Sequence, residues 1–202
     1  DYDMVQTEIQ WFRNGETYAP EKVPVIKMFN EYFGGNMSGI VFQDIRESKA
    51  LAYSTFAAYG NPQKKEEPFF MTAYVGCQAD KMKESILAMQ SLLTQLPSSE
   101  KLFSNAKSGI KNTIATTRIL KTGILFSYLN AQKKGIDYDM NEKIYLGIDR
   151  LTYNDINEFF KQQIAHKPYV LTVVGKDDAV NWEELKKYGP VKKLSLEQIF
   201  GY

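Results

Sequence analysis

The chain has 202 residues, enough to bury a substantial core in one domain, and its 44% hydrophobic and 24% charged residues are typical of folded globular proteins. Its 25 Lys and Arg residues balance 24 Asp and Glu residues, which removes the simplest electrostatic argument for binding nucleic acid or an anionic membrane surface. No apolar run approaches the roughly 20 residues that span a bilayer. A single cysteine, Cys77, excludes an internal disulfide and a cysteine-rich zinc site but does not fix the cellular compartment.

The N-terminal segment predicts an extended start. Asp1–Met4 contain neither a basic region nor an apolar signal core, so we expect the sequence to begin inside a mature or trimmed chain. Apolar or β-branched residues alternate from Val5 to Trp11, which predicts a strand with one buried face. Asn14–Gly15 then predicts a turn.

Two helices and a strand are expected next. Pro24 suits the first turn of a helix that ends at Phe33, and we expect Gly34–Gly35 to close that helix with positive φ angles. A second helix should begin near Asn36 or Ser38 and bury Val41, Phe42 and Ile45. A strand from Tyr53 to Tyr59 should follow it.

The remainder alternates helices with short strands. Local patterns predict an antiparallel partner strand and helices that carry capping residues at Ser98–Ser99, Asp139 and Thr152. They also predict a continuous apolar strand that is central in its sheet and covered on both faces, a short helix at Trp182 and a final edge strand. The strands are expected at 69–75, 169–174 and 191–194. The helices are expected at 82–96, from the Ser98–Ser99 cap through Ile114, at 124–134, after Asp139, at 156–164 and at 182–185. The order predicts one α+β domain over residues 1–202, with helices largely on one face of a mainly antiparallel sheet.

Arg46 and Tyr53 are the candidate functional residues. Positions three and four away from Arg46 carry no acidic side chain, so no intrahelical ion pair should occupy its guanidinium. A helix end that feeds a strand start could bring Arg46 and Tyr53 to one edge of the domain. Their ordinary structural role also stays open, since helix edges often carry Arg and strands favour Tyr.

This segment resembles the C-terminal, non-zinc-binding half-domain of the pitrilysin, insulin-degrading and mitochondrial processing peptidase family of zinc metallopeptidases. The resemblance is carried by Gly-Gly-x-Met-Ser at 34–38, apolar-Phe-x-x-apolar-Arg-Glu at 41–47 and Leu-Ala-Tyr at 51–53. The strand and glycine at 171–175 resemble the closing strand of that half-domain. The resemblance therefore implies a processing-peptidase-like fold over most of the chain, as a fragment of a longer protein.

The same resemblance implies a role for the two candidates. Arg46 and Tyr53 match an arginine and a tyrosine that reach into the active site of a homologous partner half, where they bind the peptide substrate and support the transition state. Zinc is expected in that partner half, which carries His-x-x-Glu-His in the same chain or in another subunit. We expect no metal site and no complete catalytic set in this segment, because His166 is the only histidine and looks like a surface loop residue.

Three functions follow from these expectations. The chain is expected to be the non-zinc half of a zinc metalloendopeptidase, inactive alone, that closes a chamber over an active half and helps to bind peptide. An alternative is a scaffold or subunit-interface domain in a protein that has lost peptidase activity. A peptide-binding module that uses an exposed sheet edge is compatible with either function.

Overall fold

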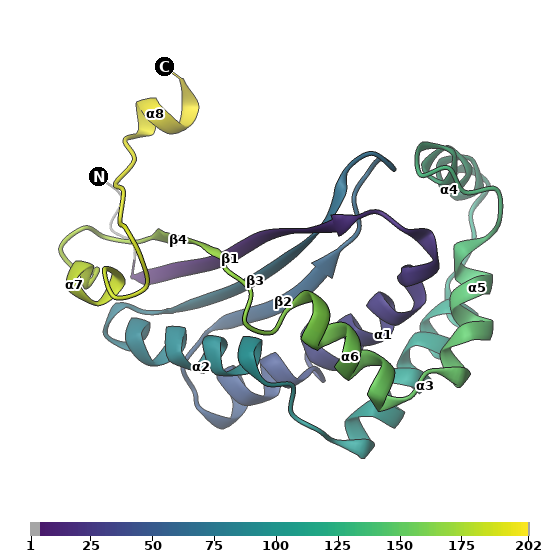
Figure 1. Ribbon diagram of the computed structural model, residues 1–202, viewed down its shortest axis with the longest axis horizontal. Helices are drawn as coiled ribbons and strands as arrows, with labels where there is room; N and C mark the ends of the chain where they lie inside the picture. Colours follow the sequence, from purple (N-terminus) through teal and green to yellow (C-terminus); the bar gives the residue numbers. More distant parts are fainter. Residues whose placement is uncertain (1–4, 202) are drawn as a thin grey trace.

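A four-stranded antiparallel sheet forms the centre of the computed structural model, which describes residues 5–201 (Figure 1). The strands are β1 (Gln6–Thr17), β2 (Ser54–Gly60), β3 (Pro68–Gln78) and β4 (Val170–Val174), in the order β2-β3-β1-β4. Helices α1 (Val23–Phe33), α2 (Met82–Thr94) and α6 (Tyr153–Gln163) lie on one face of the sheet. The predicted α+β arrangement is confirmed. The expectation made for Asp1–Met4 lies outside the described residues.

The other helices lie around this layer. Helices α3 (Glu100–Thr116), α4 (Lys121–Lys133) and α5 (Met140–Gly147) lie at one end of the sheet, whereas α7 (Trp182–Leu185) and α8 (Leu196–Phe200) lie at the other (Figure 1). Short helical turns η1 (Pro20–Lys22), η3 (Ala79–Lys81) and η4 (Ile148–Arg150) lead into or out of the main helices.

One continuous hydrophobic core lies between the sheet and its helices. β3 contributes alternate residues from Phe69 to Cys77, all with no exposed surface. Phe29 of α1 packs against Phe159 and Phe160 of α6, at ring-centroid distances of 5.3 and 6.3 Å. Because such large aromatic surfaces dominate burial energy, this contact between α1 and α6 stabilises the helical layer.

All three predicted helix caps are formed. Ser99 accepts a hydrogen bond from the Leu102 backbone N–H at the start of α3. Thr152 and Asp155 form a complete capping box at the start of α6. Asp139 caps α5 by accepting from the Asn141 N–H, without a reciprocal bond from Glu142.

The strand that the apolar run at 169–174 predicts is present, but its predicted central position is wrong. β4 pairs with β1 alone and forms one edge of the sheet, with Val170 66% exposed and Val174 49% exposed. Only Leu171 and Val173 pack against the core. The apolar run places hydrophobic side chains on both faces of β4, but the described residues cover only one of these faces. The edge strand predicted at 191–194 is also absent, because that segment has no regular structure.

The predicted turn at Asn14–Gly15 is wrong as well. β1 continues to Thr17, and its pairing with β3 shifts register between Asn14 and Thr17. A side chain at Gly15 would lie 2.2 Å from the hydroxyl of Tyr59. This glycine therefore serves close packing over a tyrosine rather than a reversal of the chain.

Gly34–Gly35 end α1 by a different mechanism from the predicted one. Gly34 has a φ of −161°, which is extended backbone, and Gly35 does not have a positive φ. A Cβ atom on Gly34 would lie 2.7 Å from the carbonyl oxygen of Ala57 and 2.8 Å from its nitrogen. The Ala57 N–H donates to the Gly34 carbonyl at 3.1 Å. The missing side chain thus lets the end of α1 contact β2 directly.

Candidate functional site

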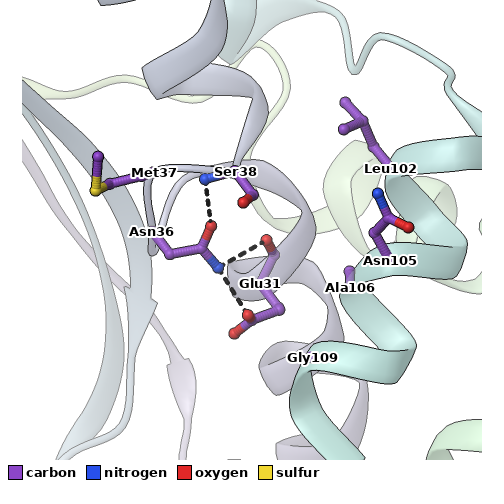
Figure 2. Close-up of a pocket in the computed structure, with 8 residues that line it drawn as sticks. All are labelled: Glu31, Asn36, Met37, Ser38, Leu102, Asn105, Ala106 and Gly109. Atoms are coloured by element: carbon purple, nitrogen blue, oxygen red, sulfur yellow. Dashed lines mark hydrogen bonds between the residues drawn. The ribbon is translucent and has the colours of Figure 1, made fainter. Parts of the chain in front are cut away.

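The candidate site begins at the connection after α1, where Asn36 holds the loop in place. Its side-chain amide donates to the Glu31 carboxylate at 2.7 Å and to the Glu31 carbonyl at 3.4 Å (Figure 2). The Asn36 side-chain oxygen accepts from the Ser38 N–H at 2.7 Å. This amide therefore fixes the entry into the second predicted helix.

The second helix is present and widens into a π-helical segment, η2 (Phe42–Ser48). The Lys49 N–H donates to the Asp44 carbonyl at 3.1 Å, one residue further back than in an α-helix. Val41, Phe42 and Ile45 are buried, as predicted. Such widened turns are frequent at functional sites because they displace side chains from the ordinary helical pattern.

Arg46 lies on the exposed side of η2. Its guanidinium carbon lies 4.9 Å from the centroid of the Phe42 ring, and its Nε atom lies 3.9 Å from the Glu47 carboxylate. These are its only side-chain partners among residues 5–201, and 44% of the side chain is exposed. The neighbouring cation, Lys49, is paired with Asp44. Both terminal amino groups of Arg46 thus remain available as donors.

Tyr53 lies directly before β2 and is half exposed. Its hydroxyl oxygen accepts a hydrogen bond from the side-chain amide of Gln78 at 2.9 Å. Because the hydroxyl acts as acceptor in that contact, its own proton is still available for donation. Gln78, at the end of β3, was not identified from the sequence, since only the pairing of β2 with β3 reveals its position beside Tyr53.

A tight reversal joins Arg46 to Tyr53. Ala50 has a φ of +50°, and the Leu51 N–H returns to donate to the Ile45 carbonyl at 3.0 Å. The Tyr53 N–H then donates to the Gly76 carbonyl of β3 at 2.9 Å. The chain from the residue before Arg46 to Tyr53 is therefore tied down at both ends, and neither candidate side chain enters the core.

The uncovered face of the sheet carries aromatic pairs that sequence analysis missed. Phe56 stacks on Tyr74 at 5.4 Å, and Phe12 stacks on Phe70 at 5.9 Å. Figure 1 shows that α1, α2 and α6 lie on the opposite face. The aromatic positions alternate with the buried ones along β1 and β3, so strand periodicity was the signal that could have identified them.

A hollow of about 360 Å³ lies between the Asn36 loop and α3, lined by Glu31, Asn36, Met37, Ser38, Leu102, Asn105, Ala106 and Gly109. Figure 2 shows the Asn36 amide turned toward Glu31 within it. The Glu31 carboxylate also faces Lys27 at 3.8 Å. The polar groups here largely bond to one another, so the hollow presents no set of convergent catalytic groups.

The described residues do not fit a zinc site. Between residues 5 and 201, no group of three or more His, Cys, Asp and Glu side chains could hold a metal ion. His166 is exposed on a loop, with a φ of +58°. Cys77 is fully buried, and burial raises the pKa of its thiol. No helix in the described part of the chain is long and apolar enough to cross a membrane.

Comparison with known proteins identifies the family. The family described as "Peptidase M16 inactive domain" matches residues 3–110, which is more than half of the chain. This chain belongs to the peptidase M16 inactive-domain family. The motifs at 34–53 lie inside the matched region. The resemblance that they carry, to the non-zinc-binding half-domain of a zinc protease family, is thus confirmed.

Known relatives extend the comparison beyond the matched region. YmxG of Bacillus subtilis, described as an uncharacterized zinc protease, is 29% identical over 97 residues, which are 46% of this chain and 23% of that protein. The M16 inactive domain structure from Pseudomonas fluorescens has a TM-score of 0.71 at 13% identity and covers 86% of this chain and 42% of its own. A Bordetella parapertussis structure, described as the inactive peptidase domain of a zinc protease, has a TM-score of 0.67 at 12% identity and covers 84% of this chain and 92% of its own. The chain thus spans less than half of the first two relatives and nearly all of the third.

Proposed function

We propose that this M16 inactive domain is the non-zinc half of a zinc metallopeptidase and binds peptide substrate in a chamber shared with a zinc-bearing homologous half. One observation carries the proposal. Arg46 and Tyr53 both lie outside the core on a single tied segment, and both keep hydrogen-bond donors that no described residue occupies.

The chemistry of these donors suits peptide binding. A guanidinium presents a rigid fork of charged donors, and a phenol adds one more, so together they hold a peptide carbonyl and stabilise the negative charge that develops on its oxygen. Arg46 is braced by the Phe42 ring, and Tyr53 is braced by Gln78. The zinc ion would belong to the partner half, where it would activate water for attack on that carbonyl.

Reconstitution with the zinc-bearing half tests this function. Arg46→Ala should lower kcat/KM for an unfolded peptide by about 100-fold or more, which is the usual cost of losing one oxyanion donor. Its unfolding free energy should fall by about 1 kcal/mol or less, because the residue is exposed and loses only a cation–π contact and a surface ion pair. Tyr53→Phe removes one neutral donor worth about 1 kcal/mol, so it should lower kcat/KM by about 5- to 10-fold without changing the fold.

Arg150→Ala is the matched control, since Arg150 is also exposed but lies on η4, outside the candidate site. Arg46→Lys keeps the charge without the planar fork and should recover only part of the activity. Full activity of Arg46→Ala would contradict the proposed role. A homologous half without His-x-x-Glu-His would instead favour the scaffold or subunit-interface alternative.

A further inference from the structure

Helix α4 carries a concentration of exposed apolar side chains. None of its 13 residues is buried in the described structure, although α4 and the two residues before Lys121 contain seven large hydrophobic or aromatic side chains that are 40–74% exposed. We call these side chains the α4 apolar surface: Ile119, Leu120, Ile124, Leu125, Phe126, Tyr128 and Leu129. Contiguous apolar patches of this kind mark interaction sites.

Two contacts join the C-terminal end of α4 to the remainder of the described chain. The Lys65 N–H donates to the Lys133 carbonyl at 3.1 Å, and Ala131 packs against the core. A hollow of about 920 Å³, which also borders Val23 of α1 and Ile144 of α5, separates the middle of α4 from the body. Figure 1 shows α4 beyond the end of the sheet. An isolated helix of this length is marginal in water, so a contact outside residues 5–201 that covered its apolar side chains would stabilise it.

The charges around this surface specify the chemistry of what covers it. Residues 101–136 include seven Lys and Arg residues and no Asp or Glu. Arg118 and Lys121 lie beside the start of α4, and Lys133 and Lys134 lie at its end. A complementary surface is therefore apolar in the centre and acidic at the rim.

We propose that the α4 apolar surface is the docking surface for the homologous half of the parent protein or complex. This inference rests on the proposed function, in which the chain is one of two halves. This chain covers only 42% of the Pseudomonas chain and 23% of the Bacillus relative, so these relatives have length enough for a second half.

Two other occupants fit the surface less well. In a symmetric contact between two copies of this chain, both partners present the same basic rim, and the like charges repel. A helix that lies flat on a membrane has one apolar face and one strongly polar face. The apolar residues from Ile124 to Leu129 spread over about 200° of the helix at 100° per residue, which suits a helix enclosed by protein.

The first experiment uses the parent protein as it exists. Hydrogen exchange followed by mass spectrometry should show the amides of α4 at least about 10-fold more protected in the parent protein or complex than in the separate 202-residue chain, which has its own continuous core. The amides of α2, which already packs on the sheet, should exchange alike in both. Equal exchange of α4 in both samples would overturn the proposal.

A second experiment measures docking. The double variant Leu125→Gln and Phe126→Gln keeps helix propensity and removes apolar area, so it should weaken binding to the separately produced homologous half by about 100-fold. The control is Leu196→Gln with Ile199→Gln on α8, which removes exposed apolar side chains at the opposite end of the molecule (Figure 1). Isothermal titration calorimetry gives the dissociation constants, and circular dichroism checks that both variants fold.

Several outcomes would overturn the docking role. The first is that the α4 variant binds the homologous half with wild-type affinity. The second is that the isolated chain forms dimers in sedimentation velocity that the α4 variant does not form. The third is that the isolated chain binds 7:3 phosphatidylcholine–phosphatidylserine vesicles, and that the α4 variant loses this binding while it docks normally. Arg46→Ala separates this proposal from the proposed function, because it should dock normally. If the α4 variant fails to dock while Arg46→Ala keeps full turnover, the surface stands and the substrate role fails.

Discussion

Replacement of Gly34 by Ala tests how closely α1 approaches the sheet beneath the candidate site. The new Cβ would lie 2.7 Å from the Ala57 carbonyl oxygen and 2.8 Å from the Ala57 nitrogen, whereas ordinary contacts begin near 3.4 Å. Both neighbours are backbone atoms of β2, which cannot rotate away. The end of α1 must therefore move, and the 3.1 Å hydrogen bond from the Ala57 N–H to the Gly34 carbonyl is lost or stretched.

The expected cost follows from these two effects. Overpacking a well-packed site costs about 1–3 kcal/mol, and the loss of one hydrogen bond adds about 1 kcal/mol. Gly34→Ala should thus destabilise the domain by about 2–4 kcal/mol. The φ of Gly34 is not positive, so no left-handed backbone strain adds to this cost.

Urea unfolding followed by circular dichroism measures this change, and thermal unfolding should show a Tm lowered by about 4–16 °C. Gly123→Ala is the matched control, because its Cβ would meet nothing within 4 Å and lies inside a helix, where alanine is preferred. A stability for Gly34→Ala within about 0.5 kcal/mol of the wild type would refute the reasoning, since substitutions free of such features usually fall in that range.

Three further predictions concern the core and one cap. Hydrogen bonds from the Thr152 hydroxyl and N–H lower the pKa of Asp155 from 3.8, so the stabilisation is present above pH 3.8 and is lost as the pH falls through the lowered value. Asp155→Asn should therefore cost about 1 kcal/mol in urea unfolding at pH 7, and this difference should disappear in strong acid. Phe29→Ala should cost about 3–5 kcal/mol, because Phe29 has no exposed surface, and a smaller loss in urea unfolding would show that the core refills the cavity. Cys77 should react with a thiol reagent only on unfolding, and rapid labelling of the native chain would contradict its burial.

Local signals predicted the elements whose stability is local. Ser99 and Thr152 cap α3 and α6 because the side-chain oxygen accepts a hydrogen bond from the N–H three residues later. This short spacing can be recognised from the sequence alone. The alternation from Val5 to Trp11 likewise predicted one buried face for β1, and Thr7, Ile9 and Trp11 are buried, since strand geometry sends neighbouring side chains to opposite sides. These features hold whatever lies elsewhere in the chain.

Features that depend on distant neighbours could not be predicted in this way. The apolar run of β4 does not reveal that β1 is its only neighbour. Glycine at positions 15 and 34 predicted a turn and a helix end with positive φ. Instead, the missing side chains of Gly15 and Gly34 make room for Tyr59 and Ala57, which are more than twenty residues away in the sequence. Glycine permits both positive φ and close approach, and only the tertiary structure distinguishes these uses.

The candidate site combines both kinds of information. The motifs around Arg46 and Tyr53 predicted which residues to consider, but the Phe42 and Gln78 contacts that brace them arise from the fold. The uncovered aromatic pairs of the sheet and the α4 apolar surface were found only in the structure. Pairing with a homologous half would explain why these apolar features coexist with a charge-balanced chain. A domain that functions alone has no need to expose them, because each exposed apolar patch invites aggregation without a compensating contact.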